Sequence, residues 1–370
     1  MTDPRISILV FSLVLSSVIG VKKISPNFGD VETKFVDYIE QFNKSYRFDV
    51  DEYRRRFITF KTSLEVIKSM NTLRTHEDSA RFGLTEYSDM THAEFVAAKL
   101  RRNSIKARTD RRSNSIIKET TDDWKSPMSQ NIIRYARATS DVDGLPRKVD
   151  WREQGVVSKV RNQGLCGACW AHSVIETVES MAAIESNSSI IELSVQQMVD
   201  CAENNNNGCL GGDTCNALEW LVQKNISIQT MQEYPMNNDS AQCKMGEFKN
   251  GSQSVHVTNF TCERFVGQEQ KILFHLANDG PVVAAVNGLL WQNYLGGIIQ
   301  FHCDGSTASL NHAVQIVGFD LEADIPYYIV RNSWGKRFGN EGYLKVQIGG
   351  NVCGIANQVS TLRVDVGLRV

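Results

Sequence analysis

The chain has 370 residues, of which 42% are hydrophobic and 22% charged, proportions that are ordinary for a globular protein. The formal net charge of −2 argues against a general nucleic-acid binder. No stretch beyond the N-terminus is apolar and long enough to span a bilayer, so we expect neither a nucleic-acid nor a membrane partner.

Residues 1–20 have the pattern of a signal peptide. Arg5 precedes an apolar run over 6–19, and Gly20, with Val18 two positions before it, offers a small-residue cleavage point. A buried N-terminal helix or an uncleaved anchor is the alternative, but the run is short for a membrane span. Six sequons also favour entry into the secretory lumen: Asn43, Asn187, Asn225, Asn238, Asn250 and Asn259.

Between residues 31 and 100, apolar side chains recur at spacings of three and four, which predicts charged amphipathic helices. A stripe on one helical face is formed by Glu52, Arg56, Phe60, Ser63, Ile67 and Asn71. Taken alone, such a stripe indicates a surface helix that packs on its own domain.

Residues 101–144 lack periodicity and carry seven basic residues between Arg101 and Lys118. This composition predicts an exposed linker that is easily cut. A more apolar, glycine-rich region begins at Leu145.

All nine cysteines lie between Cys166 and Cys353. The region before them must fold without disulfides, whereas the C-terminal region is expected to be cross-linked in an oxidising compartment. Because the count is odd, at least one thiol stays free, and a single unpaired cysteine in a secreted enzyme is a candidate nucleophile.

Cys166 and Cys169 stand three apart, as in a redox pair or half of a zinc site. Neither interpretation fits, because no second ligand pair with comparable spacing follows and redox motifs stand at the head of a βαβ unit. With Gly167, Ala168 and Trp170 the two cysteines match the signature of the papain and cathepsin group. The chain therefore resembles the papain-like cysteine proteases.

The partners that this signature requires also occur. His312 lies 143 positions after Cys169, and Asn332 follows 20 residues later in an Asn-Ser-Trp-Gly sequence. An apolar helix is predicted over 170–186, so Cys169 would sit at a helix N-terminus, where the dipole stabilises a thiolate. His312 would be the general base and acid, Asn332 would orient its ring, and Trp334 would shield that bond. Gln163 and the Cys169 N–H would stabilise the oxyanion.

The resemblance extends to the N-terminal half. The helical stripe, apart from Ser63 and Thr59, and the sequence over 83–89 resemble the two motifs of the family's propeptides. The resemblance implies a signal peptide over 1–20, an inhibitory propeptide over 21–144 and a mature peptidase over 145–370.

The fold implied is α+β, with a helical lobe around Cys169, a barrel-like lobe that holds His312 and Asn332, and an active-site groove between them. Apolar runs over 282–286, 313–317 and 327–330 predict buried strands of the second lobe. The implied activity is that of a cysteine endopeptidase made as a zymogen, in the lysosome or outside the cell. A fold-retaining protein that binds or inhibits without cleaving is the alternative.

The resemblance implies protein and peptide substrates, inhibition by the chain's own propeptide, possible inhibitors of the cystatin type, a monomeric state, and neither cofactor nor metal. It also implies three disulfides: Cys166–Cys209, Cys201–Cys243 and Cys303–Cys353. Cys215 and Cys262 have no partner in the family pattern, so they form either a fourth bridge or two buried thiols.

In the substrate groove, the resemblance places Gly211 and Gly212 on the wall, where bare backbone can bind an extended substrate. The pocket for the second residue before the scissile bond would be lined by Asp213, Thr214, Cys215, Ala313 and Gln358. This set predicts a pocket that is more polar than a purely aliphatic one.

Two residues depart from the family pattern. His172 and Phe338 stand where Phe and Trp are usual. His172 would lie one turn into the helix that carries Cys169, where it could perturb the pKa of the thiol. We expect it instead to pack within the domain.

Overall fold

The computed structural model describes residues 30–100, 144–237, 239–245 and 253–368. The expected signal peptide, the linker and the sequons at Asn238 and Asn250 lie outside these residues. Within the described ranges, every helix is too short or too polar to cross a bilayer. The described residues divide into two compact units, one that ends at Lys61 and one that begins at Thr62.

The first unit is built around aromatic side chains. It contains α2 (Val31–Gln41), a 3-10 turn η1 (Ser45–Phe48) and the first half of α3 (Val50–Thr72). Phe35, which is fully buried, has five other rings within 6.3 Å of its own: Tyr38, Tyr46, Tyr53, Phe57 and Phe60. In this unit Glu52 also pairs with Arg56, at 2.8 Å, as their spacing on one face predicts.

In the second unit, α3 is followed by β1 (Arg81–Phe82) and α4 (His92–Lys99). We call residues 73–100 the docking segment. Its path is fixed by Asn71, whose amide donates to Phe82 O at 2.8 Å and accepts from Phe82 N at 3.0 Å. The helical pattern expected over 31–100 is thus interrupted, because here the backbone bonds to Asn71 and to β5 (Tyr294–Gly296) instead of to itself.

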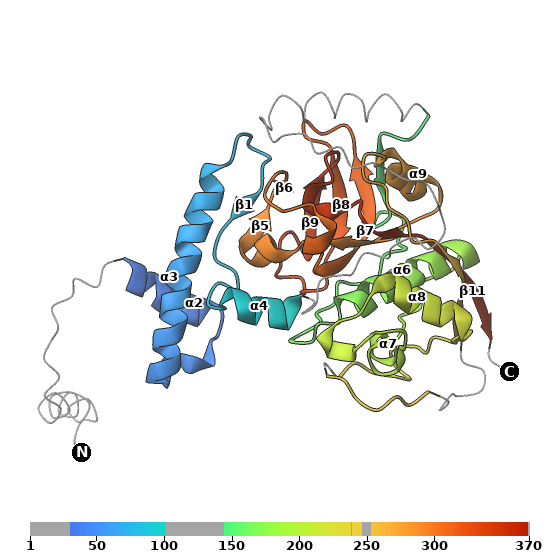
Figure 1. The fold of residues 1–370 in the computed structure, drawn as a ribbon, viewed down its shortest axis with the longest axis horizontal. Coiled ribbons are helices and arrows are strands. Elements are labelled where there is room, and N and C mark those ends of the chain that lie inside the picture. The colour runs from blue at the N-terminus through green and yellow to red at the C-terminus, as the bar shows by residue number, and fades with distance from the viewer. Residues whose placement is uncertain (1–29, 101–143, 238, 246–252, 369–370) are drawn as a thin grey trace, which may run out of the picture. The chain divides into compact units, whose positions relative to one another are not determined.

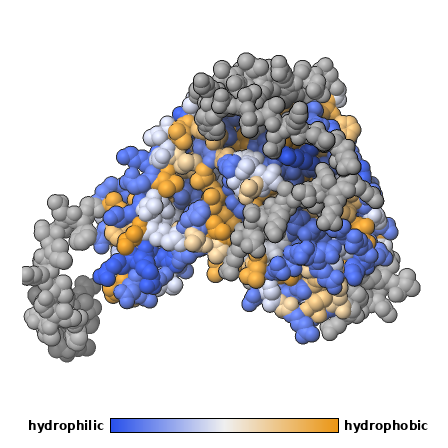
Figure 2. Space-filling view, in the orientation of Figure 1, coloured by the Kyte–Doolittle hydropathy of each residue, from blue (hydrophilic) through white to orange (hydrophobic). Residues whose placement is uncertain are grey.

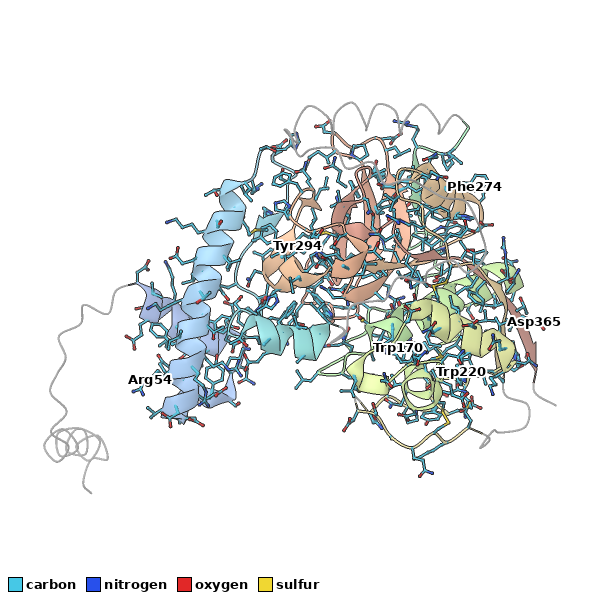
Figure 3. The ribbon with its side chains drawn as sticks, in the orientation of Figure 1. Arg54, Trp170, Trp220, Phe274, Tyr294 and Asp365 are labelled. Atoms are coloured by element: carbon cyan, nitrogen blue, oxygen red, sulfur yellow. A yellow bond between two sulfur atoms is a disulfide. The ribbon has the colours of Figure 1, made fainter. Side chains whose placement is uncertain are left out.

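The helical lobe is organised around α6 (Cys169–Ser186), which is buried along most of its length. It packs with α7 (Val195–Cys201), α8 (Thr214–Gln223) and the two-stranded sheet β3–β11 (Gln253–Phe260, Leu362–Leu368). In Figure 1, α6 lies between α8 and the large sheet. Trp170 and Trp220, labelled in Figure 3, belong to this lobe's core. The helix predicted over 170–186 is confirmed.

The sheet lobe is built on a seven-stranded sheet. Its strands follow the order β10-β4-β7-β8-β9-β6, and β2 (Lys148–Asp150) pairs with the end of β7. The bounds are β4 Val282–Val286, β6 Ile298–Ile299, β7 His312–Asp320, β8 Tyr327–Arg331, β9 Tyr343–Gln347 and β10 Val359–Ser360, with α9 (Gln270–Asn278) packed on β7. Short 3-10 turns complete the chain: η2 Gly208–Leu210, η3 Leu289–Asn293, η4 Thr307–Ser309 and η5 Val352–Gly354.

The three predicted apolar runs form β4, the first part of β7 and β8, and all their residues are buried. They are continuous in hydrophobicity because α6 covers one face of β4 and β7, while the lobe's own core covers the other. The α+β architecture with a helical lobe and a sheet lobe is therefore confirmed.

Candidate active site

Cys169 is the first residue of α6, so the positive end of the helix dipole lies at its thiol. It is buried and is the one cysteine outside the disulfides. The three expected bridges are present, Cys166–Cys209, Cys201–Cys243 and Cys303–Cys353. Cys215 and Cys262, for which the sequence left a bridge or two thiols open, form a fourth disulfide.

His312 and Asn332 are brought together by strand pairing. His312 begins β7, and Asn332 follows the last residue of the neighbouring antiparallel strand β8. The His312 Nε2 lies 2.8 Å from Asn332 Oδ1, a geometry in which the imidazole N–H donates to the amide oxygen. The other ring nitrogen, Nδ1, has no hydrogen-bond partner in the described part of the chain. It is therefore the nitrogen that is available for proton transfer.

Aromatic rings enclose this pair. The Trp334 ring lies 4.9 Å from that of His312, and Trp291 meets the same imidazole edge-on at 5.7 Å. This burial lowers the pKa of His312 to about 4, although the bond to Asn332 acts in the opposite direction. The charges of Lys99 and His172 lower the pKa further.

Gln163 is completely buried and held at both ends of its amide. Its Oε1 accepts from the Ser333 hydroxyl at 2.6 Å, and its Nε2 donates to Cys166 O at 2.9 Å. The same Nε2 lies 3.2 Å from the carbonyl oxygen of Lys99, in the docking segment. A side-chain donor fixed in this way can stabilise a developing oxyanion.

The docking segment passes through this site. Lys99 and Leu100 are 3% and 1% exposed, so they are enclosed as fully as core residues. The Lys99 ammonium donates to Gly164 O at 2.8 Å, and burial lowers its pKa to about 8. A Cβ on Gly167 would lie 3.3 Å from Leu100 O and 2.7 Å from Cys209 O. Glycine at position 167 thus leaves room for a peptide to pass.

The expected pocket residues cluster in part. Gln358 Nε2 lies 3.4 Å from Asp213 Oδ2 and 3.2 Å from Thr214 Oγ1. Asp213 also caps α8 by accepting from the backbone N–H of Cys215 at 3.0 Å. The sulfur of Cys215 is not a thiol but part of the fourth disulfide.

The remaining groove residues lie nearby. Ala313, next to His312, pairs with Ala285, whose N–H donates to Gln358 O at 3.0 Å. Gly211 has a φ of 114°, which favours glycine, and a Cβ on Gly212 would lie 2.4 Å from the Trp170 ring.

His172 packs inside the domain, 2% exposed, but its surroundings are charged. Its Nδ1 lies 3.7 Å from the Glu176 carboxylate, which is 3.4 Å from the Arg331 guanidinium. Burial lowers the pKa of His172, although Glu176 acts in the opposite direction. Phe338, the second departure, is buried and meets the Trp334 ring edge-on at 4.9 Å.

Three charged residues of the site are not recognisable from the sequence: Lys99, Glu176 and Arg331. No local pattern identifies them, since their environment is made by distant segments. The spacing of four residues from His172 to Glu176 places both on one helical face, but it does not reveal that Arg331 closes the cluster from β8.

One set of residues in the described ranges could hold a metal ion. Ligand atoms of His76, Asp78 and Asp324 lie within 4.8 Å of one another. Both aspartates are exposed, and His76 Nδ1 already accepts from the Asp78 N–H at 3.2 Å. Proton transfer between a thiol and an imidazole needs no ligand of this kind.

Comparison with known families gives two matches. Residues 145–363 match the model of the papain family cysteine proteases, and residues 35–95 match that of the cathepsin propeptide inhibitor domain.

Curated relatives agree. Cathepsin O of Mus musculus is 46% identical over 220 residues, covering 60% of this chain and 69% of that protein. Cathepsin O of Homo sapiens is 37% identical over 311 residues, covering 84% and 88%. These relatives confirm a resemblance to cathepsin O that is visible in the sequence over 193–197, 291–300 and 328–334.

Solved precursors share the fold. Digestive procathepsin L2 of Tenebrio molitor is 28% identical with a TM-score of 0.71, over 90% of this chain and 99% of that one. The recombinant stem bromelain precursor is 27% identical with a TM-score of 0.70 and the same coverage. The chain thus belongs to the papain family of cysteine proteases and carries the propeptide inhibitor domain of a zymogen.

Proposed function

We propose that this cysteine endopeptidase cleaves peptide bonds with Cys169 as nucleophile and His312 as general base and acid. The observation that carries the assignment is the 2.8 Å contact between His312 and Asn332, which leaves the second ring nitrogen without a partner among the described residues. Gln163 supports it, since its buried amide already bonds a peptide carbonyl, that of Lys99.

In the proposed mechanism, the Cys169 thiol transfers its proton to His312 Nδ1, and the thiolate attacks the carbonyl carbon of the substrate. The carbonyl oxygen takes up the electron pair and is stabilised by Gln163 Nε2 and the Cys169 N–H. When the C–N bond breaks, the imidazolium gives its proton to the leaving amine, and a thioester remains. Water, deprotonated by His312, then releases the acid and regenerates the thiol.

Latency is proposed to come from residues 21–144 as the propeptide, with the mature enzyme beginning at 145. The Lys99 carbonyl occupies the Gln163 donor, and Leu100 passes over Gly167, so a substrate cannot enter. Burial, with a smaller contribution from the Lys99 ammonium, lowers the pKa of His312 and so disfavours the thiolate–imidazolium pair. The cut that releases the enzyme would fall between residues 101 and 144.

Specificity is proposed to depend on the pocket lined by Gly211, Gly212, Asp213, Thr214, Cys215, Ala313 and Gln358. The carboxylate of Asp213 and the amide of Gln358 favour a polar or basic side chain at the second position before the scissile bond. A peptide library varied at that position tests this, and a uniform preference for large aliphatic residues would contradict it.

Lysosomal or extracellular protein turnover is the proposed setting, for a monomer that cystatin-type inhibitors can block. The exposed sequons at Asn187, Asn225 and Asn259 support lumenal routing. Sensitivity of the secreted or lysosomal chain to a glycosidase tests the lumenal routing, and its mass by gel filtration tests the monomeric state.

The central experiment is acid activation followed by titration with an epoxide inhibitor of thiol proteases. We expect one equivalent to label Cys169 in the wild type and none in Cys169→Ser. Failure of the activated wild type to label would favour the alternative, a catalytically silent binding protein, which the family comparisons do not favour.

A further inference from the structure

The docking segment binds an edge of the sheet lobe that differs from the catalytic groove. Its backbone pairs with residues 292–298 through Ala80 N to Ile298 O (2.8 Å), Ile298 N to Asp78 O (2.7 Å) and Gly83 N to Asn293 O (2.9 Å). Once the propeptide leaves, these backbone groups lose their partners. An unpaired strand edge of this kind can accept another extended chain.

The edge has a pocket for one aromatic side chain. Phe82 is 6% exposed, with its ring 6.4 Å from that of Tyr294 and 5.3 Å from that of His302. The next residue is best small, because a Cβ on Gly83 would lie 2.4 Å from a terminal carbon of Leu295 and would displace that side chain. Hydrophobic residues gather over β1 and β5 in Figure 2, and Leu295 remains 43% exposed there. Removal of Phe82 would enlarge this apolar surface.

The residue before the aromatic meets positive charge. A cavity of about 420 Å³ beside β5 is lined by Arg81, Arg152 and Lys345. Arg152 is neutralised by Asp150 at 2.6 Å, but Lys345 forms no ion pair with any described residue and lies 4.1 Å over the Tyr327 ring. The propeptide therefore places Arg81, a third cation, in a cavity that would suit an anion better.

We propose that in the mature enzyme this edge is a second binding site for extended segments of protein substrates, with a preference for an acidic residue, then an aromatic residue, then glycine. The backbone edge supplies affinity, the vacated Phe82 pocket selects the aromatic ring, and Lys345 selects the acidic side chain. The inference rests on the proposed removal of the propeptide. It also implies that Arg81 weakens the propeptide's own hold and so favours its release.

The test uses mature enzyme made by acid activation of the full chain and blocked at Cys169 with the epoxide. Three fluorescein-labelled peptides with the sequence of residues 78–86 are compared by anisotropy: native, Arg81→Glu and Phe82→Ala. We expect the Arg81→Glu peptide to bind about threefold tighter than the native one at low salt. The Phe82→Ala peptide should bind about tenfold or more weaker.

Two controls separate this site from general charge attraction. A scrambled peptide with the composition of Arg81→Glu should not bind, and an enzyme with Lys345→Ala should lose the threefold preference. The inference is overturned if the Phe82→Ala peptide binds as tightly as the native peptide. It is also overturned if neither the native nor the Arg81→Glu peptide shows saturable binding at millimolar concentration.

The functional arm uses unblocked enzyme. The unlabelled Arg81→Glu peptide should raise the KM for a protein substrate that carries an Asp-Phe-Gly segment and leave hydrolysis of a short peptide substrate unchanged. Equal inhibition of both substrates, or of neither, refutes a role in substrate capture. Epoxide titration is independent of this edge, so a failure of the catalytic assignment is recognised separately.

Discussion

Acidification should destabilise the precursor through His312. Burial holds the pKa of this imidazole at about 4, against 6.5 for the free group. Below pH 6.5 the imidazole binds a proton in the unfolded chain but stays neutral in the folded precursor. The contribution of His312 to the free energy of unfolding is therefore full above pH 6.5 and falls as the pH decreases toward 4. At about pH 4.5 the loss from His312 alone amounts to about 2.5 kcal/mol.

The measurement is urea unfolding of the Cys169→Ser precursor, which cannot cleave itself, at about pH 7 and about pH 4.5. The same two measurements are made on Cys169→Ser/His312→Leu. This variant lacks the His312 imidazole but keeps all carboxylates and the other histidines. We expect the double variant to lose about 2.5 kcal/mol less on acidification. Equal losses in the two proteins, or an NMR titration of His312 near 6.5, would refute the reasoning.

Three further changes test the site and its supports. Gln163→Ala should lower kcat for a short peptide about 10²- to 10³-fold with little change in KM, and an unchanged kcat would exclude its oxyanion role. Phe82→Ala in the precursor should release the docking segment at lower urea, at a cost of about 3–4 kcal/mol, and an unaltered release midpoint would argue against the pocket. Glu176→Gln should cost about 3–5 kcal/mol because it removes the carboxylate that balances the charge of the buried Arg331. Adding Arg331→Met should recover part of that loss in the same unfolding assay, and strictly additive costs would show that the two are not coupled.

The proposed catalytic residues can be picked from the sequence because each stands in a local context with chemical meaning. Cys169 opens an apolar helix, and His312 and Asn332 lie at the ends of apolar runs that become neighbouring strands. Once β7 and β8 pair, the ends of these two runs meet, as the 2.8 Å contact between His312 and Asn332 shows.

Other features of the site depend on which remote segments meet in the fold, and the spacing of residues in the sequence does not show this. Cys215 and Cys262 are 47 residues apart, and their pairing becomes evident only once the end of β3 is placed beside α8. The charged environment of His172 arises from Arg331 on another lobe. The path of Lys99 across Gln163 likewise follows from the docking of residues 78–90 and not from any motif around Lys99.

The pairing of β2 with β7 would anchor the N-terminus of the proposed mature chain. Lys148, Val149 and Asp150 align with residues 318–320, and Arg147 bonds to Leu321 from both its carbonyl and its guanidinium, at 2.8 and 3.0 Å. Exopeptidases that trim an upstream cut would meet a terminus that is tied into a sheet. Cuts at several positions in the linker would therefore be trimmed to one N-terminus near residue 145. Intact-mass analysis of the enzyme would then show a single mass.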